Sequence, residues 1–144
     1  MVIPDVNVLV YAFRSDVPDH HRYLAWLEAL VNSDQTYALP NSVLSGFLRV
    51  VTHPRAFAYP SPLDSALAFA GQIRGAAGCV PVAPGARHWD IFSGLCQRAQ
   101  VRGNLVPDAY LAALAIESGS EFITTDRDFA RFPGLRWRHP FDPQ

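Results

Sequence analysis

Lysine is absent from this chain of 144 residues, and all twelve of its basic residues are arginine. The absence excludes mechanisms that need a catalytic or phosphate-binding lysine, such as Walker-type phosphate loops and Schiff-base chemistry. It also argues against haloacid-dehalogenase-like phosphatases and phospho-receiver domains. The phosphatases also place an aspartate after their first strand, and both classes use a lysine to steady the phosphate.

Cysteine and long apolar runs are also scarce. The only two cysteines, Cys79 and Cys96, lie in apolar stretches without a partner at metal-ligand spacing, so we expect buried, reduced thiols. No apolar run is long enough to cross a bilayer, and the start MVIPDVNVLV lacks the basic lead and cleavage site of a signal peptide. We therefore expect a soluble, cytoplasmic protein that does not associate with membranes.

Strong charge of one sign is missing as well, because the formal net charge is −1. Any contact with nucleic acid must then come from local clusters of arginine. Hydrophobic residues make up 49% of the chain, which is enough for one core. We expect a single domain over residues 1–144.

Short apolar runs alternate with longer helical patterns along the whole chain. Strands are expected at Val2–Asp5, Thr36–Leu39, Cys79–Ala83, Glu121–Thr125 and, at an edge, Leu135–Arg138. Helices are expected at residues 7–13, 18–31, 40–51, 63–74, 87–102, 107–118 and 127–132. Strands separated by helices predict an α/β three-layer sandwich with a mostly parallel sheet covered on both faces.

Three aspartates fall where a parallel sheet binds its ligands. Asp5 and Asp126 follow the first and fourth expected strands, and Asp108 lies in the first turn of a helix whose apolar stripe faces the core. Asp108 and Asp126 could equally cap helices, whereas a charge directly after a buried strand usually marks a site. Three carboxylates at one edge would repel unless a cation neutralised them, which favours Mg²⁺, or Mn²⁺ as the second choice.

The motifs that carry these residues resemble a known family. Asp5-Val6-Asn7, Arg49 within SGFLRVVTHPR, Asp108 in VPDAYLAALA and Asp126 in TTDRDF are together similar to the PIN-domain ribonuclease toxins of VapC-type toxin–antitoxin systems. The resemblance runs nearly end to end. It implies a five-stranded parallel sheet, a divalent metal site, hydrolysis of single-stranded or loop RNA, a homodimer, and a cognate VapB-like antitoxin that blocks the site.

The resemblance also assigns roles to residues. Asp5, Asp108 and Asp126 would be the catalytic metal ligands, and Asn7 would steady Asp5. Further candidates for supporting contacts are Thr125, Asp128 and Ser42. Arg49 and Arg55 are candidates for binding RNA. A second basic stretch, Arg127, Arg131, Arg136 and Arg138, is interleaved with aromatic residues, and its arginines could equally be a solvated face.

One position departs from the family pattern. The family usually has a glutamate in the helix after the second strand, and the matching residue here is Gly46. Three hypotheses follow: three aspartates hold the metal without a fourth acid, Asp128 helps them, or the protein binds RNA or its partner without efficient cleavage. We favour the first, because losing one such ligand usually lowers activity more than it abolishes binding.

Overall fold

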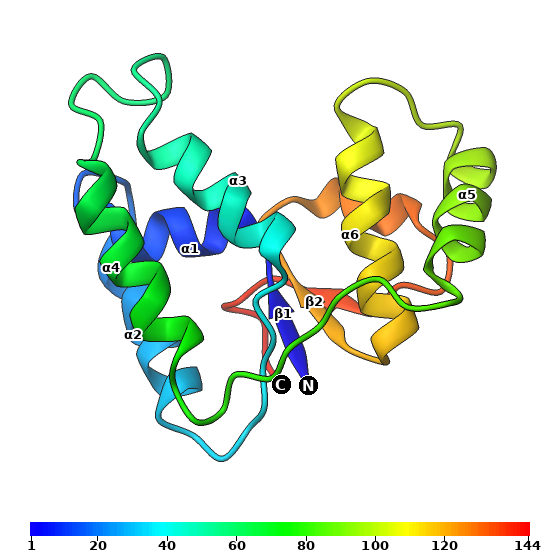
Figure 1. The fold of residues 1–144 in the computed structure, drawn as a ribbon, viewed down its shortest axis with the longest axis horizontal. Helices are drawn as coiled ribbons and strands as arrows, with labels where there is room; N and C mark the ends of the chain where they lie inside the picture. The colour runs from blue at the N-terminus through cyan, green and yellow to red at the C-terminus, as the bar shows by residue number, and fades with distance from the viewer.

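The computed structural model describes all of residues 1–144 and places a parallel sheet between two groups of helices (Figure 1). The strands are β1 (Val2–Pro4), β2 (Glu121–Ile123) and β3 (Trp137–Arg138). They pair in the order β1-β2-β3, with both pairs parallel. The helices within residues 6–74 lie on one side of the sheet, and those within residues 88–118 lie on the other. This arrangement is the expected α/β sandwich.

The helices follow the apolar periodicity of the sequence. They are α1 (Val6–Phe13), α2 (His20–Val31), α3 (Asn41–Val51), α4 (Leu63–Arg74), α5 (His88–Ala99), α6 (Leu105–Ser118) and the 3-10 helix η1 (Arg127–Arg131). Most ends lie within two residues of the predicted ones. Helix α5 ends three residues early because Gln100 turns into the left-handed region at φ 50°. None of the helices has the length and apolarity needed to cross a bilayer.

The expected sheet of five strands is only partly formed. The second and third expected strands are reduced to single bridges, in which Tyr37 pairs in parallel with Val2 on one side and with Cys79 on the other. Ala38 N–H donates to Val2 O at 2.9 Å, and Val80 N–H donates to Tyr37 O at 2.8 Å. Both segments then run into prolines, at positions 40 and 81, which have no N–H to continue a ladder.

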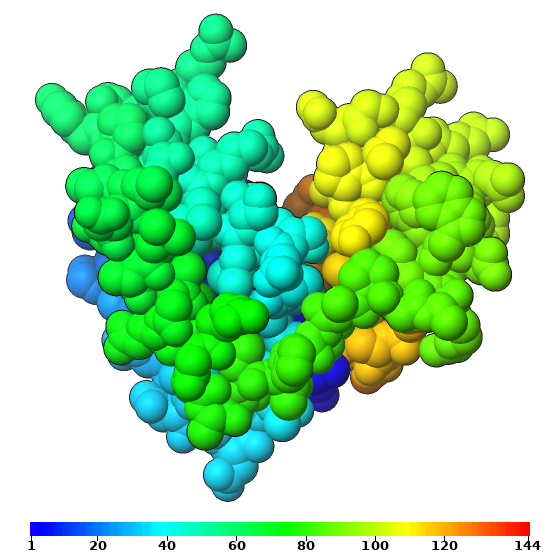
Figure 2. All heavy atoms as spheres, viewed as in Figure 1, coloured from blue at the N-terminus to red at the C-terminus, as the bar shows by residue number.

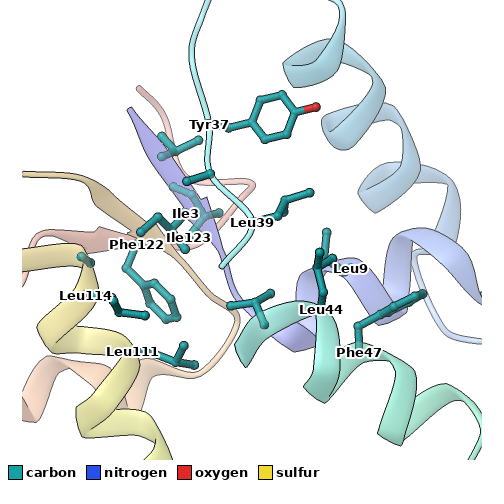
Figure 3. Close-up of a cluster of buried hydrophobic side chains, with 14 of the residues drawn as sticks. Ile3, Leu9, Tyr37, Leu39, Leu44, Phe47, Leu111, Leu114, Phe122 and Ile123 are labelled. Carbon is teal, nitrogen blue, oxygen red and sulfur yellow. The ribbon is translucent and has the colours of Figure 1, made fainter. Parts of the chain in front are cut away.

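The core fills both faces of the sheet. One cluster of 29 buried hydrophobic residues joins the strands to the helices on either side. In Figure 3, Leu9, Leu44 and Phe47 approach from α1 and α3, while Leu111 and Leu114 approach from α6 and meet Phe122. Burying this apolar surface is the main contribution that holds both helix groups against the strands. It also fixes where the carboxyl ends of the strands lie.

Candidate functional site

Asp5 is held in place by two hydrogen bonds at the end of β1. The residue caps α1, and its side chain is buried with 6% exposure. Val6 N–H donates to Oδ1 at 2.7 Å, and the Thr124 hydroxyl donates to Oδ2 at 2.7 Å. Burial raises the pKa of Asp5 above its usual value, these two bonds oppose the rise, and the charge of Asp126 adds to it. The carboxylate is therefore oriented and costly to ionise.

Thr124 links the ends of two neighbouring strands. Pro4 pairs with Ile123 in the parallel register, so the next residues, Asp5 and Thr124, lie side by side. The Thr124 side chain is fully buried, and its oxygen also accepts a hydrogen bond from Asp126 N–H at 3.0 Å. Because the same hydroxyl donates to Asp5, Thr124 holds two of the three aspartates relative to each other.

Asp108 faces the other two aspartates from α6. The side chain lies in the first turn of that helix and is half-buried. Its pKa is raised to about 6, first by burial and then by the negative charges of Asp5 and Asp126. Asp128 also raises the pKa, and Arg131 lowers it. The structure thus brings Asp5, Asp108 and Asp126 within electrostatic reach of one another.

The donor set at this edge suits a hard cation in its chemistry. The charge of Asp126 raises the pKa of Asp5, and the charges of Asp5 and Asp126 raise the pKa of Asp108. A divalent ion with oxygen ligands would neutralise this negative charge. As the side chains are placed, no group of three or more His, Cys, Asp or Glu residues is close enough to hold an ion. Binding would therefore require the half-buried Asp108 and Asp126 to rotate toward Asp5.

The supporting contacts differ from the expected ones. The hydroxyl that reaches Asp5 belongs to Thr124, and Thr125 makes no side-chain hydrogen bond. Asn7 also makes none, so the steadying role expected of it is filled by Thr124 and Val6 N–H. Two consecutive threonines after a strand covered on both faces give no sequence signal as to which one points inward.

Asp128 and Arg131 flank the aspartates on η1. Asp126 caps this short helix, and its Oδ1 accepts Asp128 N–H at 2.9 Å. Arg131 donates from Nε to Asp128 O at 3.0 Å, and its guanidinium lies 3.8 Å from the Asp128 carboxylate. Of all the arginines, only Arg131 changes the pKa of Asp108. Arg131 is therefore the positively charged side chain that interacts most directly with the acidic group.

The other candidate arginines fall into two groups. Arg49 and Arg55 are exposed, and their side chains make no hydrogen bond or ion pair within the chain. Arg136 and Arg138 are used structurally: Arg136 donates to Gly119 O at 2.8 Å, and Arg138 pairs with Glu121 at 2.9 Å. The predicted basic stretch is therefore not one continuous free surface.

Gly46 faces the segment that holds Asp5. A Cβ atom built at this position would lie 2.8 Å from the Val6 Cγ2 atom. Helix α3 therefore approaches the first turn of α1 more closely than a residue with a side chain would allow. Figure 2 shows the surface hollowed between α3 and α6, the helices that carry Gly46 and Asp108. The position that lacks an acid thus lies next to the acidic group.

Comparisons of the sequence identify its relatives. The family model described as the PIN domain matches residues 2–135. The chain is 44% identical over 144 residues to the VapC ribonuclease Mb2897 of Mycobacterium bovis, covering 100% of this chain and 98% of that protein. It is 39% identical over 140 residues to ribonuclease VapC25 of Mycobacterium tuberculosis, covering 97% of this chain and 99% of that protein.

Solved structures agree in fold. VapBC2 from Rickettsia felis, bound to a DNA fragment from its promoter, superposes with a TM-score of 0.70 at 19% identity, covering 96% of this chain and 98% of that chain. Mycobacterium tuberculosis VapC20, described as a sarcin-ricin-loop-cleaving toxin, gives a TM-score of 0.66 at 16% identity, with coverage of 94% and 99%. The full-length matches and the acidic edge of the sheet agree: the chain belongs to the PIN-domain family, as a member of the VapC type.

Proposed function

We propose that this protein is a metal-dependent endoribonuclease, the toxin of a toxin–antitoxin module, that hydrolyses RNA phosphodiester bonds. The observation that carries the proposal is the convergence of Asp5, Asp108 and Asp126 at the carboxyl end of the sheet, where the charges of Asp5 and Asp126 act on Asp108 and that of Asp126 acts on Asp5. Relatives that match the chain from end to end are named ribonucleases, which supports the same reaction class.

The three aspartates would hold Mg²⁺ or Mn²⁺. When bound, such an ion supplies Lewis acidity, which lowers the pKa of a coordinated water and stabilises charge on the scissile phosphate. Asp5 is held for this role, since the Thr124 hydroxyl and Val6 N–H fix both of its oxygens. The same bonds favour the ionised form that a ligand needs.

Asp108 is the group best suited to handle a proton. With its pKa raised to about 6 in the free protein, its carboxylate binds a proton more readily than an ordinary aspartate does. Arg131 on η1 opposes that rise and could contact a phosphate oxygen with its guanidinium. The chain's own residues would thus orient the ligand set, accept a proton and bind the anionic backbone.

The partners follow from the same family. Solved neighbours include the assemblies VapBC2 and VapBC-1, which share the fold of this chain. We propose that a VapB-like antitoxin binds this protein and covers the acidic edge, and that the toxin forms a homodimer.

Gly46 favours a second candidate function. The helix position that usually carries an acid has none, and Val6 fills the space next to it. A protein with this site could bind RNA or antitoxin while cutting poorly. The two functions differ in turnover and share the capacity to bind RNA.

A cleavage assay separates these candidates. Structured RNA is incubated with the wild type in Mg²⁺, in Mn²⁺ and in EDTA, and both fragments and RNA binding are measured. Metal-dependent fragments support the nuclease, and binding without fragments supports the second candidate. Asp5→Asn should lower cleavage by at least about 100-fold, which exceeds the loss typical of residues that contact a metal ligand but not the metal. Asp64→Asn, an exposed aspartate on α4, is the matched control and should cut like the wild type.

A further inference from the structure

A cavity of about 410 Å³ lies beside the acidic edge, between the start of α3, the segment 79–84 and the middle of α6. None of the three aspartates lines it. Its volume falls in the range of about 300–1,000 Å³ that is typical of small-molecule pockets. The lining has thirteen residues, with prolines, valines and leucines forming the walls and Asn41, Ser42, Arg74 and Tyr110 supplying the polar side chains.

The polar groups of this cavity have no partners in the chain. The amide of Asn41, the hydroxyls of Ser42 and Tyr110, and the guanidinium of Arg74 make no hydrogen bond or ion pair. Ser42 was expected to support the aspartates, and the structure places it here instead. Donors and acceptors that converge on one hollow without internal partners are available to a ligand.

Tyr110 is held rigidly although its hydroxyl is free. Its ring packs edge-on against His88 at 4.5 Å and Phe92 at 5.8 Å between centroids. The buried His88 also hydrogen-bonds to Tyr110 O through Nε2 at 3.1 Å. Packing of this kind fixes the ring before a ligand arrives, so little conformational entropy is lost on binding.

The position of the cavity ties it to the acidic edge. Ser42 lies one turn before Gly46 on the same face of α3, and Gly46 lies against Val6, the residue that follows Asp5. A nucleotide chain whose phosphate meets the aspartates would therefore pass the cavity with a neighbouring nucleotide. No acidic residue lines the cavity, and Arg74 gives it positive charge that suits a polyanion.

We propose that this cavity is a nucleobase pocket, which takes up one base of the RNA next to the scissile phosphate and so sets the sequence that is cut. The proposal rests on the nuclease function above. Proteins read single-stranded RNA by burying a base against flat apolar or aromatic surfaces and hydrogen-bonding to its edge. Here the prolines and valines cover the faces of the base, and the Asn41 amide, a group that pairs with base edges, reads its edge.

The first test measures binding without cleavage. The four nucleoside 5′-monophosphates are titrated in EDTA against the wild type by NMR. We expect one base to be preferred. Asn41→Ala and Tyr110→Phe each remove one hydrogen-bonding group, so affinity for the preferred base should fall by roughly five- to tenfold. Ala83→Trp changes an exposed lining residue and fills the cavity, so binding should be lost. Arg102→Gln, an unpaired arginine outside the lining, should change nothing.

The second test measures sequence preference in cleavage. RNAs randomised around the cut are digested with Mg²⁺, and the ratio of kcat/KM between the best and worst base is compared. Asn41→Ala should reduce that ratio by about the same five- to tenfold, and Arg102→Gln should keep it.

The outcomes keep the pocket and the nuclease apart. If RNA is cut but the base preference survives Asn41→Ala and Ala83→Trp, the pocket proposal is wrong and the nuclease stands. If nucleotides bind selectively but no RNA is cut, the nuclease fails, base binding in the pocket stands, and its role in choosing the cut is overturned. Sedimentation tests whether a second copy of the chain occupies the cavity instead. If nucleotides do not bind and Ala83→Trp turns a dimer into a monomer, the cavity is an interface between copies and the proposal is overturned.

Discussion

Single side chains at the acidic edge show how burial and mutual repulsion combine. Asp108 reaches a pKa of about 6, first because burial disfavours its charged form and then because the charges of Asp5 and Asp126 act on it. Asp5 is nearly fully buried, and hydrogen bonds from the Thr124 hydroxyl and Val6 N–H offset part of the rise in its pKa that burial causes. The free site therefore holds negative charge at a cost in stability, and that cost gives measurable predictions.

Asp108→Asn should stabilise the free protein above pH 6. The pKa of Asp108 is raised in the folded state, so folding is favoured while the group is protonated, and that stability is lost as pH rises from about 4 through about 6. At pH 7.5 the neutral variant should gain of the order of 1 kcal/mol, allowing for solvent screening. Urea unfolding at pH 4.5 and pH 7.5 measures this, and equal differences at both values would contradict the assignment.

Arg131 should contribute to RNA affinity, whereas Arg127 should not. The charge of Arg131 acts on Asp108, whereas the side chain of Arg127 is 68% exposed and lies 3.7 Å from Asp142. Losing one phosphate contact should reduce the slope of log affinity against log salt by about 0.7 for single-stranded RNA. Fluorescence anisotropy of Arg131→Gln and Arg127→Gln at several salt concentrations compares them. Identical slopes for both variants would remove Arg131 from the interface.

Among the elements, α1 and α3 depend on a close contact at Gly46. A glycine inside a helix costs about 1 kcal/mol relative to alanine, so Gly46→Ala would stabilise an isolated helix. In the protein the added Cβ would meet Val6 at 2.8 Å, and a β-branched side chain in a helix has little freedom to move away.

Gly46→Ala should therefore destabilise the protein by about 1 kcal/mol, since overpacking of roughly 1–3 kcal/mol exceeds the gain in helix propensity. Thermal unfolding measures the change. Val6→Ala removes the side chain that the new Cβ would meet. Adding Gly46→Ala to the Val6→Ala variant should therefore cost much less stability than adding it to the wild type. If Gly46→Ala costs the same free energy of unfolding in both backgrounds, the contact with Val6 is not the reason for its cost.

Arg14 fastens the end of α1 to the loop that precedes α4. Its guanidinium donates to Tyr59 O at 2.7 Å and to Ser61 Oγ at 3.0 Å, and it lies 4.0 Å from the centre of the Phe57 ring. The residue is only 9% exposed. It therefore joins α1 to this loop through hydrogen bonds from a nearly buried charged group.

Arg14→Met should cost roughly 2–3 kcal/mol, because hydrogen bonds from a charged donor are lost while most of the apolar volume remains. Urea unfolding gives the free energy, and Arg22→Met is the control, since that arginine is exposed and contacts only the Phe141 ring. A loss at position 14 no larger than at position 22 would show that the loop is held by other contacts.

At the scale of the whole molecule, the acidic edge links metal binding to folding. An ion that binds only the folded protein raises the free energy of unfolding, by about 2.7 kcal/mol at a concentration of 100 times its Kd. Mn²⁺ should therefore raise the melting temperature of the wild type, and Asp108→Asn should abolish most of that rise. Calorimetry with Mn²⁺ and with EDTA measures this effect independently of activity. A similar rise in both proteins would place the ion elsewhere.

Local patterns in the sequence determined nearly all the helices and placed the three aspartates at strand ends or in the first turn of a helix. Helix α4 has the predicted bounds Leu63–Arg74, and α6 ends where Gly119 adopts φ 67°. Periodicity and caps act over a few residues, so they can be read without knowing the fold.

Only the tertiary structure decided what those residues touch. The choice of Thr124 over Thr125 depends on the register of β1 with β2, between residues more than a hundred positions apart in the chain. The contact of Gly46 with Val6 and the place of Ser42 in a cavity depend on how helices approach one another. Such contacts arise from packing across the sheet, and local patterns in the sequence do not show which distant residues come into contact.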